Sequence, residues 1–546
     1  MPVLQERESI PTRISFFALA FVLAVCALPV AGQIAVTTYH YDNNRTGWNP
    51  NELNLTPTNV VKGSFGVVQT VALDDQVDGQ PLVVPGVVIT AGQFKGTTHD
   101  VVYVATEGNT VYAIDAHSGT ILLSPNFGTP VPLPLGCNNN GPNVGINSTP
   151  VIDPDSNTLY VIVYTQTQNG STQNYTLHAL DLGSLTDKVA PQPVVASYTL
   201  TDGTTFNFNA TYQRQRPALL LANGSIYAGF GSFCDFSANL SRGWLLGWTA
   251  NTLAPFPSNQ LIDQQATDKD SFFLSSIWMS GYGLATDDEG NILFVTGNSD
   301  AHTYDGVTNI QESVIKISPT LTTVLDLFTP NNQVALDQGD VDFGSGGVLL
   351  LPDQPGSTPH LGVAAGKDGN MYFMNEDNLG GYSAKKNNVL GTYQIGGCWC
   401  GQSYFIGADG TGRIVTSGGN SIGLYQVQTS PTAALSFLKG SASIPGSQNP
   451  GFFTTVSSNG TSNAIIWALS HPTGVGKNPI SLFAFNPALG KTKMKKIFSA
   501  TAGYWPNTGG NSNLVPVVAN GEVFVASNKT LKIFGLLGGN AKTKKH

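Results

Sequence analysis

The chain repeats a short pattern of apolar and polar positions. Its clearest copy is Val101–Gly119, which reads V-V-Y-V-A-T-E-G-N-T-V-Y-A-I-D-A-H-S-G. Short apolar runs separated by turn residues are typical of β-strands joined in hairpins. The copy therefore predicts a strand, a tight turn, a second strand that ends at Asp115, and a Ser-Gly turn.

Eight such units follow one another at a spacing of about 60 residues, and a fixed repeat decides the architecture. We predict an all-β fold, an eight-bladed β-propeller of four-stranded antiparallel blades over residues 65–537. Phe65–Leu73 is expected to complete the last blade and close the ring. A solenoid or two stacked sandwiches are the alternatives. The units are Gln80–Gly119, Ser148–Leu185, Arg216–Leu253, Gly281–Leu321, Gly346–Leu379, Ser403–Gln428, Phe452–Leu489 and Leu514–Leu537.

The charge balance limits the partners. The net charge is −9 and charged residues make up only 11% of the chain. Nucleic-acid binding needs a basic face, so this partner is not expected. The basic clusters Lys491–Lys496 and Lys542–Lys545 are interpreted as solvated surface, and residues 538–546 as a disordered basic tail.

The N-terminus has the pattern of a secretory signal. Arg7 and Arg13 precede the apolar run Ile14–Val30, and small residues follow at Ala31 and Gly32. We expect residues 1–32 to be a signal peptide, residues 33–64 a lead-in, and the protein to be secreted or periplasmic. Lipid anchoring at Cys26 is not favoured, because Val precedes that residue. No later segment is apolar for long enough to span a bilayer, so an integral membrane protein is not expected.

Four cysteines remain beyond the predicted signal, and an oxidising compartment would permit disulfides. They allow three pairings, which the sequence does not distinguish. A bond across Trp399 needs a tight ring, so its two neighbours are expected to pack as small apolar residues, or one of them to bridge elsewhere. The four are Cys137, Cys234, Cys398 and Cys400.

The repeated strand-turn-strand-Asp phrase resembles that of the quinoprotein-dehydrogenase-like propellers. The resemblance covers Val36–Leu537, and Tyr39–Gly47 is similar to the lead-in of secreted bacterial members. It implies a site on the propeller axis for pyrroloquinoline quinone (PQQ) with Ca²⁺. The family includes PQQ-dependent alcohol and sugar dehydrogenases and also cofactor-free propellers that bind proteins, so the fold does not decide the activity.

The resemblance also assigns candidate residues. Asn298 and, more loosely, Asp235 match metal ligands of the family, and Asp342, with Asp340 second, matches the catalytic base. Lys367 stands where family enzymes place a cation against the quinone. Trp399 lies where the family has an aromatic residue near the cofactor.

Two departures weaken the match to an enzyme. Family alcohol dehydrogenases have two adjacent cysteines above PQQ, where this chain has only Cys137. The tryptophan beneath PQQ aligns near Gly281, with Trp278 three residues earlier. We therefore expect a propeller that binds a small molecule or an envelope or extracellular protein through a degenerate quinoprotein site.

Two enzymatic alternatives remain. One is a PQQ- and Ca²⁺-dependent alcohol or sugar dehydrogenase with a diverged pocket. The other is a carbohydrate-active enzyme, which would need paired carboxylates across the channel.

Overall fold

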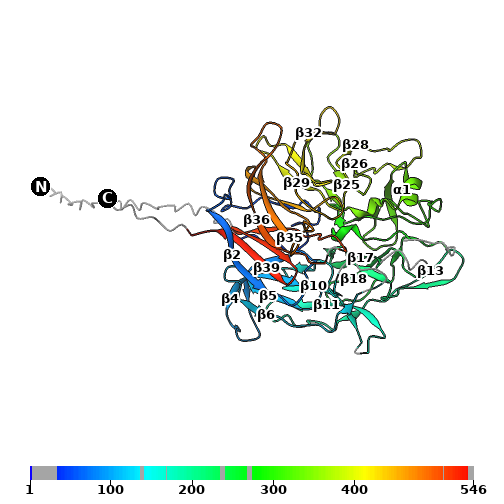
Figure 1. The fold of residues 1–546 in the computed structure, drawn as a ribbon, viewed down its shortest axis with the longest axis horizontal. Coiled ribbons are helices and arrows are strands. Elements are labelled where there is room, and N and C mark those ends of the chain that lie inside the picture. The colour runs from blue at the N-terminus through cyan, green and yellow to red at the C-terminus, as the bar shows by residue number, and fades with distance from the viewer. Residues whose placement is uncertain are drawn as a thin grey trace. The chain divides into compact units, whose positions relative to one another are not determined.

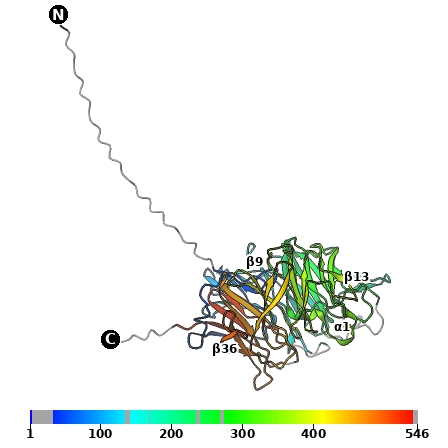
Figure 2. The same ribbon diagram turned by 90° about the horizontal axis from the view of Figure 1, so that it is seen from above.

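The computed structural model describes residues 1–2, 33–133, 135, 141–167, 169–233, 240–266, 274–507 and 509–538. The described residues from Gln33 onward form one compact unit whose regular secondary structure is almost all β-strand (Figure 1, Figure 2). The strands of the described residues form eight blades with antiparallel pairing inside each blade, which confirms the predicted fold class.

The first four blades follow the chain in order. Blade 1 contains β3 (Leu82–Val88), β4 (Thr98–Ala105), β5 (Val111–Asp115) and β6 (Ile121–Leu123). Blade 2 contains β9 (Val151–Asp153), β10 (Thr158–Gln166), β11 (Gln173–Asp181) and β12 (Gln192–Pro193). Blade 3 contains β15 (Gln213–Gln215), β16 (Leu220–Ala222), β17 (Ser225–Ser232), β18 (Trp244–Thr249) and β19 (Gln260–Leu261). Blade 4 contains β20 (Ala285–Thr286), β21 (Ile292–Val295), β22 (Val314–Ile317), β23 (Val324–Thr329) and the added parallel strand β27 (Gly381–Tyr382).

The other four blades complete the ring. Blade 5 contains β24 (Val348–Leu350), β25 (Leu361–Ala365), β26 (Asn370–Asn375) and β28 (Gly391–Gln394). Blade 6 contains β29 (Ser403–Ile406), β30 (Gly412–Thr416), β31 (Gly423–Gln428) and β32 (Ala434–Gly440). Blade 7 contains β33 (Thr454–Asn459), β34 (Ser462–Leu469), β35 (Pro479–Asn486) and β36 (Lys495–Tyr504), with β1 (Trp48–Asn49) parallel to β33. Blade 8 contains β37 (Val517–Ala519), β38 (Glu522–Ser527), β39 (Thr530–Leu536) and β2 (Phe65–Ala72).

The remaining elements are small and lie in the connections. They are the strand pairs β7 (Val131–Pro132) with β8 (Asn143–Val144) and β13 (Ser197–Thr199) with β14 (Thr205–Asn207), the helix α1 (Gln333–Gly339), and 3-10 turns at Met279–Gly281 and Phe343–Ser345. Figure 2 shows α1 in the green region of the chain. No helix in the described ranges is long and apolar enough to cross a membrane.

Ring closure joins the two ends of the chain in one blade. β2 pairs antiparallel with β39, from Phe65 opposite Leu536 to Ala72 opposite Thr530. Figure 1 shows the blue strand β2 beside the red strand β39. This pairing confirms the prediction made for Phe65–Leu73, because the N-terminal strand β2 supplies the outer strand of the last blade.

Burial follows the position of each strand in its blade. The second strand of blade 2, β10, is buried over Thr158–Tyr164, because both of its faces pack against neighbouring blades. The outer strand β28 of blade 5 alternates between half-buried and exposed positions. The second strands are therefore buried over long continuous runs, whereas an outer strand such as β28 keeps the alternating pattern.

The lead-in segment, residues 36–49, contacts all eight blades, and we call it the hub of the ring. Residues Val36–Asn49 hydrogen-bond to the first strand of every blade, with donor–acceptor distances of 2.7–3.0 Å. Within the segment, Arg45 is fully buried and donates to the carbonyls of Leu284 at 2.7 Å and Tyr39 at 2.9 Å. His40 and Arg45 have φ values of 53° and 66°, so the backbone coils tightly enough to visit all blades in turn.

Candidate functional site

A cavity of about 180 Å³ lies where loops of blades 3 to 8 meet. These loops either precede the first strand of a blade or follow its second strand. The lining residues are Arg214, Arg216, Ser232, Phe233, Ser276, Trp278, Asp340, Asp342, Lys367, Trp399, Asn449, Gly509, Gly510 and Asn511. None of them belongs to the lead-in, so the hub and the cavity are separate parts of the ring.

Lys367 and Asp342 form the charged centre of this cavity. Nζ of Lys367 lies 2.6 Å from Oδ2 of Asp342 and 2.8 Å from Oδ1 of Asp340. Asp342 precedes blade 5, and Lys367 follows the second strand of the same blade. The backbone N–H of Lys367 donates to the Asp342 carbonyl at 3.0 Å. Gly366 permits this approach, because a Cβ there would lie 2.5 Å from Cα of Phe343.

Two tryptophans flank the Lys367 ammonium. Nζ lies 5.7 Å from the ring centroid of Trp278 and 5.5 Å from that of Trp399. The ring centroid of Trp278 also lies 5.8 Å from Cζ of Arg216, and the indole N–H donates to Oδ1 of Asp342 at 3.3 Å. Cation–π contacts of this kind stabilise the cations, and both tryptophans line the cavity.

Asn298 lies behind Asp342, away from the cavity lining. Its backbone N–H donates to Oδ1 of Asp342 at 3.0 Å. Its side chain is fully buried, and neither Oδ1 nor Nδ2 has a hydrogen-bond partner among the described residues. Glu312 is equally buried and accepts from the Phe343 N–H through Oε2, whereas its Oε1 has no partner in the described chain.

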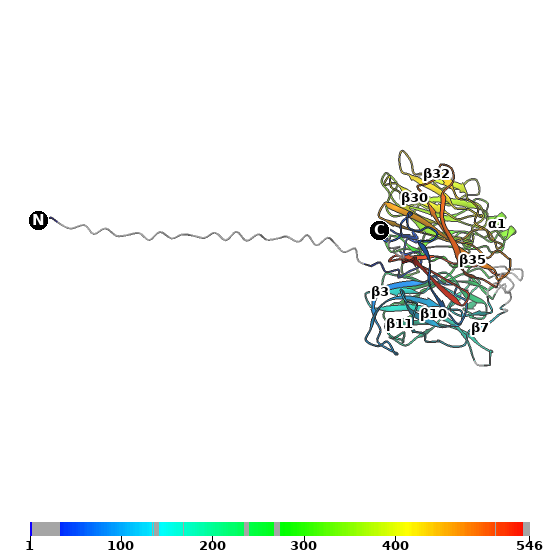
Figure 3. The ribbon, with the colours of Figure 1, turned by 60° about the vertical axis from the view of Figure 1, so that its left-hand side comes forward.

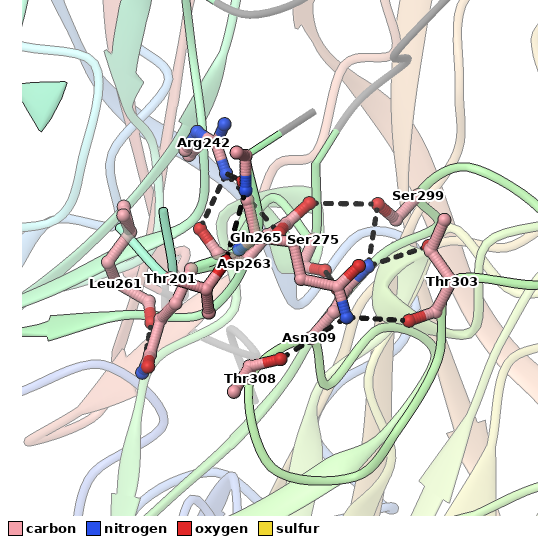
Figure 4. A network of polar contacts seen from close by, with 12 residues as sticks. Thr201, Arg242, Leu261, Asp263, Gln265, Ser275, Ser299, Thr303, Thr308 and Asn309 are labelled. Carbon is pink, nitrogen blue, oxygen red and sulfur yellow. Dashed lines mark hydrogen bonds and ion pairs between the residues drawn. The ribbon is translucent and has the colours of Figure 1, made fainter. Parts of the chain in front are cut away.

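A polar network fixes the loop that follows Asn298 (Figure 4). Ser299 donates to Asp263 at 3.3 Å, and Asp263 forms an ion pair with Arg242 at 3.2 Å. Asn309 donates to Ser299 at 3.3 Å and accepts from Ser275 at 2.7 Å. Burial raises the pKa of Asp263 to about 6 despite the Arg242 charge. The network anchors the backbone that presents Asn298 to Asp342.

Burial and neighbouring charges shift the ionisation of the cavity groups in different directions. Burial opposes the charge of Lys367, but Asp342 and Asp340 outweigh it and the pKa rises. Burial raises the pKa of Asp340. Burial and the nearby Arg214 lower the pKa of Arg216 to about 9. The carboxylates of Asp78 and Glu107 act on Arg216 in the opposite direction and partly offset this fall.

Cys398 and Cys400 form a disulfide across Trp399, with a sequence separation of 2. The expectation that they would remain separate apolar residues is therefore wrong, although both are fully buried as expected. The loop before β29 brings their Cα atoms to 4.8 Å, which lies within the range that a disulfide spans. The bond holds the backbone on both sides of Trp399 at the cavity wall.

The structure brings most of the predicted site residues together. Asp342, Asp340, Lys367, Trp278 and Trp399 line one cavity, and Asn298 contacts Asp342. Asp235 and Cys137 lie outside the described residues.

Sequence reasoning missed Arg214, Arg216 and Glu312. The two arginines lie shortly before β16 of blade 3. Asp342 lies in the same position before β24 of blade 5, and Trp399 before β29 of blade 6. That shared position before a first strand is the signal that could have identified them.

The described residues do not by themselves fit a calcium ion. Ca²⁺ takes about six to eight oxygen ligands. Here Asn298 and Asp342 offer amide and carboxylate oxygens, but Asp342 already pairs with Lys367. No group of three His, Cys, Asp or Glu side chains in the described ranges is arranged to hold a metal.

Comparison with protein-family models and with curated protein sequences finds no match. Solved structures share the fold. A quinohemoprotein alcohol dehydrogenase from Comamonas testosteroni matches with a TM-score of 0.58 and 12% identity, over 94% of this chain and 82% of that one. A quinohemoprotein alcohol dehydrogenase from Pseudomonas putida has a TM-score of 0.58 and 13% identity, over 94% and 81%. A europium-containing methanol dehydrogenase has a TM-score of 0.58 and 11% identity, over 92% and 98%.

The fold is thus that of the quinoprotein alcohol dehydrogenase propellers, as the repeat indicated. At these identities the likeness concerns architecture, and function has to be argued from the cavity.

Proposed function

We propose that the protein is a ligand-binding propeller whose central cavity takes a small, planar, anionic molecule, on a quinoprotein-like scaffold that does not turn it over. The main support for this proposal is the surroundings of Lys367, a buried ammonium that is paired with Asp342 and flanked by Trp278 and Trp399. Aromatic faces favour a planar ligand. Arg216, for which the described chain offers no ion-pair partner, favours an anionic one.

Pyrroloquinoline quinone belongs to this chemical class, and the side chains present are compatible with it. Trp278 and Trp399 would offer ring contacts, and Arg216 would offer positive charge. A bound quinone supplies two-electron redox chemistry.

The state of Asp342 argues against a working dehydrogenase. A general base needs free lone pairs that reach the substrate hydroxyl. The Asp342 carboxylate instead contacts the Lys367 ammonium, the Trp278 indole N–H and the Asn298 backbone N–H. These three donors stabilise the carboxylate and leave it poorly placed to accept a substrate proton.

The alternative is a PQQ- and Ca²⁺-dependent dehydrogenase with a diverged pocket. It is favoured by the convergence of Asn298, Asp342 and Lys367, with the buried amide oxygen of Asn298 left without a partner among the described residues. For such an enzyme, Asp235 would be a further candidate ligand to the metal. We keep a secreted or periplasmic location as an expectation from the N-terminal sequence.

Titration calorimetry with PQQ, with and without Ca²⁺, tests both candidates. We expect binding that does not depend on Ca²⁺ and that weakens at least about tenfold in Arg216→Met, because a buried charged contact is lost. Lys385→Met, which removes an exposed lysine of blade 5, is the matched control. Absence of PQQ binding by the folded protein would overturn the quinone class. Ca²⁺-dependent oxidation of alcohols or sugars would overturn the binding role in favour of the dehydrogenase.

A further inference from the structure

Blades 6 and 7 form a basic sector in an otherwise acidic chain. The sequence has no Asp or Glu between Asp409 and Glu522, although the net charge of the whole chain is −9. The same stretch carries Arg413, Lys439, Lys477, Lys491, Lys493, Lys495 and Lys496. The acidic side chains are therefore concentrated in the other blades, and the charge of the molecule is strongly uneven.

Most of these lysines gather where the outer strands of the two blades meet. β32 is the outer strand of blade 6 and β36 that of blade 7, and Figure 3 shows β32 at the periphery. Gly440, the last residue of β32, forms a parallel bridge with Lys493, and Nζ of Lys439 donates to the Gly490 carbonyl at 2.7 Å. The turn before β36 is thereby held against the end of β32.

The lysines of this turn are not neutralised by the protein. Lys491, Lys493 and Lys495 are exposed, and none forms an ion pair within the described residues. Their charges face solvent, and the stretch of sequence between Asp409 and Glu522 that contains them has no Asp or Glu.

Large apolar side chains are exposed on β32 and in the turn itself. Phe437 is 60% exposed, Leu438 is 37% exposed and Leu489 is 46% exposed. Phe437 lies at the bridge itself, because a Cβ added at Gly440 would be 3.9 Å from its Cζ. We call Phe437, Leu438, Leu489 and the three turn lysines the basic rim patch.

We propose that the basic rim patch docks the protein on an anionic phospholipid surface. Lysines next to exposed aromatic and aliphatic side chains are the combination that binds such an interface: the charges meet the headgroups and the apolar groups enter the boundary with the acyl chains. A nucleic acid or an acidic polysaccharide would use the lysines but would leave Phe437 and Leu489 without a role. The acidic blades are repelled by the same surface, so the uneven charge also orients the molecule.

Flotation of the full chain with vesicles tests the proposal. We compare phosphatidylcholine vesicles with equimolar mixtures of phosphatidylcholine and phosphatidylglycerol. The chain is expected to float only with the mixed vesicles. Each lysine near an anionic surface contributes about a fivefold gain in partitioning. The triple variant Lys491→Gln, Lys493→Gln and Lys495→Gln should therefore bind on the order of 100-fold less strongly.

A second triple variant has the same change in charge elsewhere: Lys95→Gln, Lys385→Gln and Lys386→Gln, all exposed residues of other blades. It should bind like the wild type. Phe437→Ser should weaken binding by a similar factor at low and high salt, whereas the loss caused by the first triple variant should shrink at high salt, because salt screens the lysines but not the apolar contact; the Debye length falls from about 10 Å at 0.1 M to about 3 Å at 1 M. Circular dichroism is used to check that each variant is folded.

Three outcomes would overturn the proposal: no flotation with anionic vesicles, equal loss in both triple variants, or no effect of Phe437→Ser at any salt concentration. Binding to heparin or DNA together with failure to float would assign the patch to a soluble polyanion instead.

Discussion

At the scale of single residues, the central cavity depends on one lysine. Lys367 pairs with Asp342 and Asp340 and lies against two indole rings. Its side chain is 13% exposed and that of Asp342 only 1% exposed, so the pair exists largely out of water. A buried pair of this kind contributes little net stability when intact, but the loss of one partner leaves an uncompensated charge.

Lys367→Met should lower the free energy of unfolding by about 3–5 kcal/mol, because Asp342 is left as a buried charge without its cation. Urea denaturation followed by tryptophan fluorescence measures this. Adding Asp342→Asn should recover a large part of the loss, since the buried carboxylate partner of Lys367 is then gone and the remaining partner, Asp340, is 55% exposed to water. A single variant as stable as the wild type, or a double variant less stable than the single one, would contradict the coupling.

At the scale of elements, the junction between the last and first blades holds a titratable contact. Nε2 of His117, just after β5 of blade 1, lies 3.0 Å from Oδ2 of Asp100, and Nδ1 lies 3.2 Å from Oε1 of Glu522 in β38 of blade 8. Partial burial opposes the charge of the imidazole, but the two carboxylates outweigh it and raise the pKa of His117. Protonated His117 therefore links the two blades that close the ring.

The sign of the resulting pH dependence follows from this raised pKa. The extra stability is fully present below the unfolded histidine pKa of about 6.5 and is lost as the pH rises through the raised folded value. Because the His117 side chain is 53% exposed, we expect a difference of less than about 1 kcal/mol.

Unfolding of wild type and His117→Gln, compared at about pH 5.5 and about pH 9, measures this difference. The wild type should be the more stable protein at the acidic pH, and the two should converge at the alkaline pH. A constant offset at both values would show that the contact is not ionic.

At the scale of the whole molecule, the lead-in Val36–Asn49 connects all the blades. It bonds to the first strand of each, and the Arg45 guanidinium joins Thr38, Tyr39, Asp42 and Leu284. A ring of repeats whose neighbours contact only each other would lose blades one at a time. The common hub couples the blades, so we expect the ring to unfold as one unit.

Arg45→Lys should destabilise the entire propeller by about 3 kcal/mol or more, because one ammonium cannot replace the Nε and Nη1 groups that together serve four acceptors, three of them in buried contacts. Arg413→Lys is the matched control: Arg413 is also buried, but it bonds only to Asp409, Thr411 and Gly412 of its own hairpin, so its replacement should cost less than that of Arg45. Calorimetric melting measures both. Equal losses in the two variants, or separate transitions for different blades, would contradict the role of the hub.

The architecture follows from the repeat in the sequence, because a strand-turn-strand repeat buries its apolar faces only when the units pack against one another. The eight units and the closing strand β2 could be predicted in this way. The sequence also selected much of the cavity, since Asp342 and Trp399 precede the first strands of blades 5 and 6, and Lys367 follows the second strand of blade 5.

Only the tertiary structure decided which groups touch. The Lys367–Asp342 pair, the buried amide of Asn298 and the disulfide between Cys398 and Cys400 depend on how loops of different blades converge at the axis. The part played by Arg216, and the meeting of Phe437 with the lysine turn, likewise require the packing of blades side by side. Repetition specifies the packing within and between blades, whereas the chemistry belongs to residues that do not repeat, and their partners are distant in the chain.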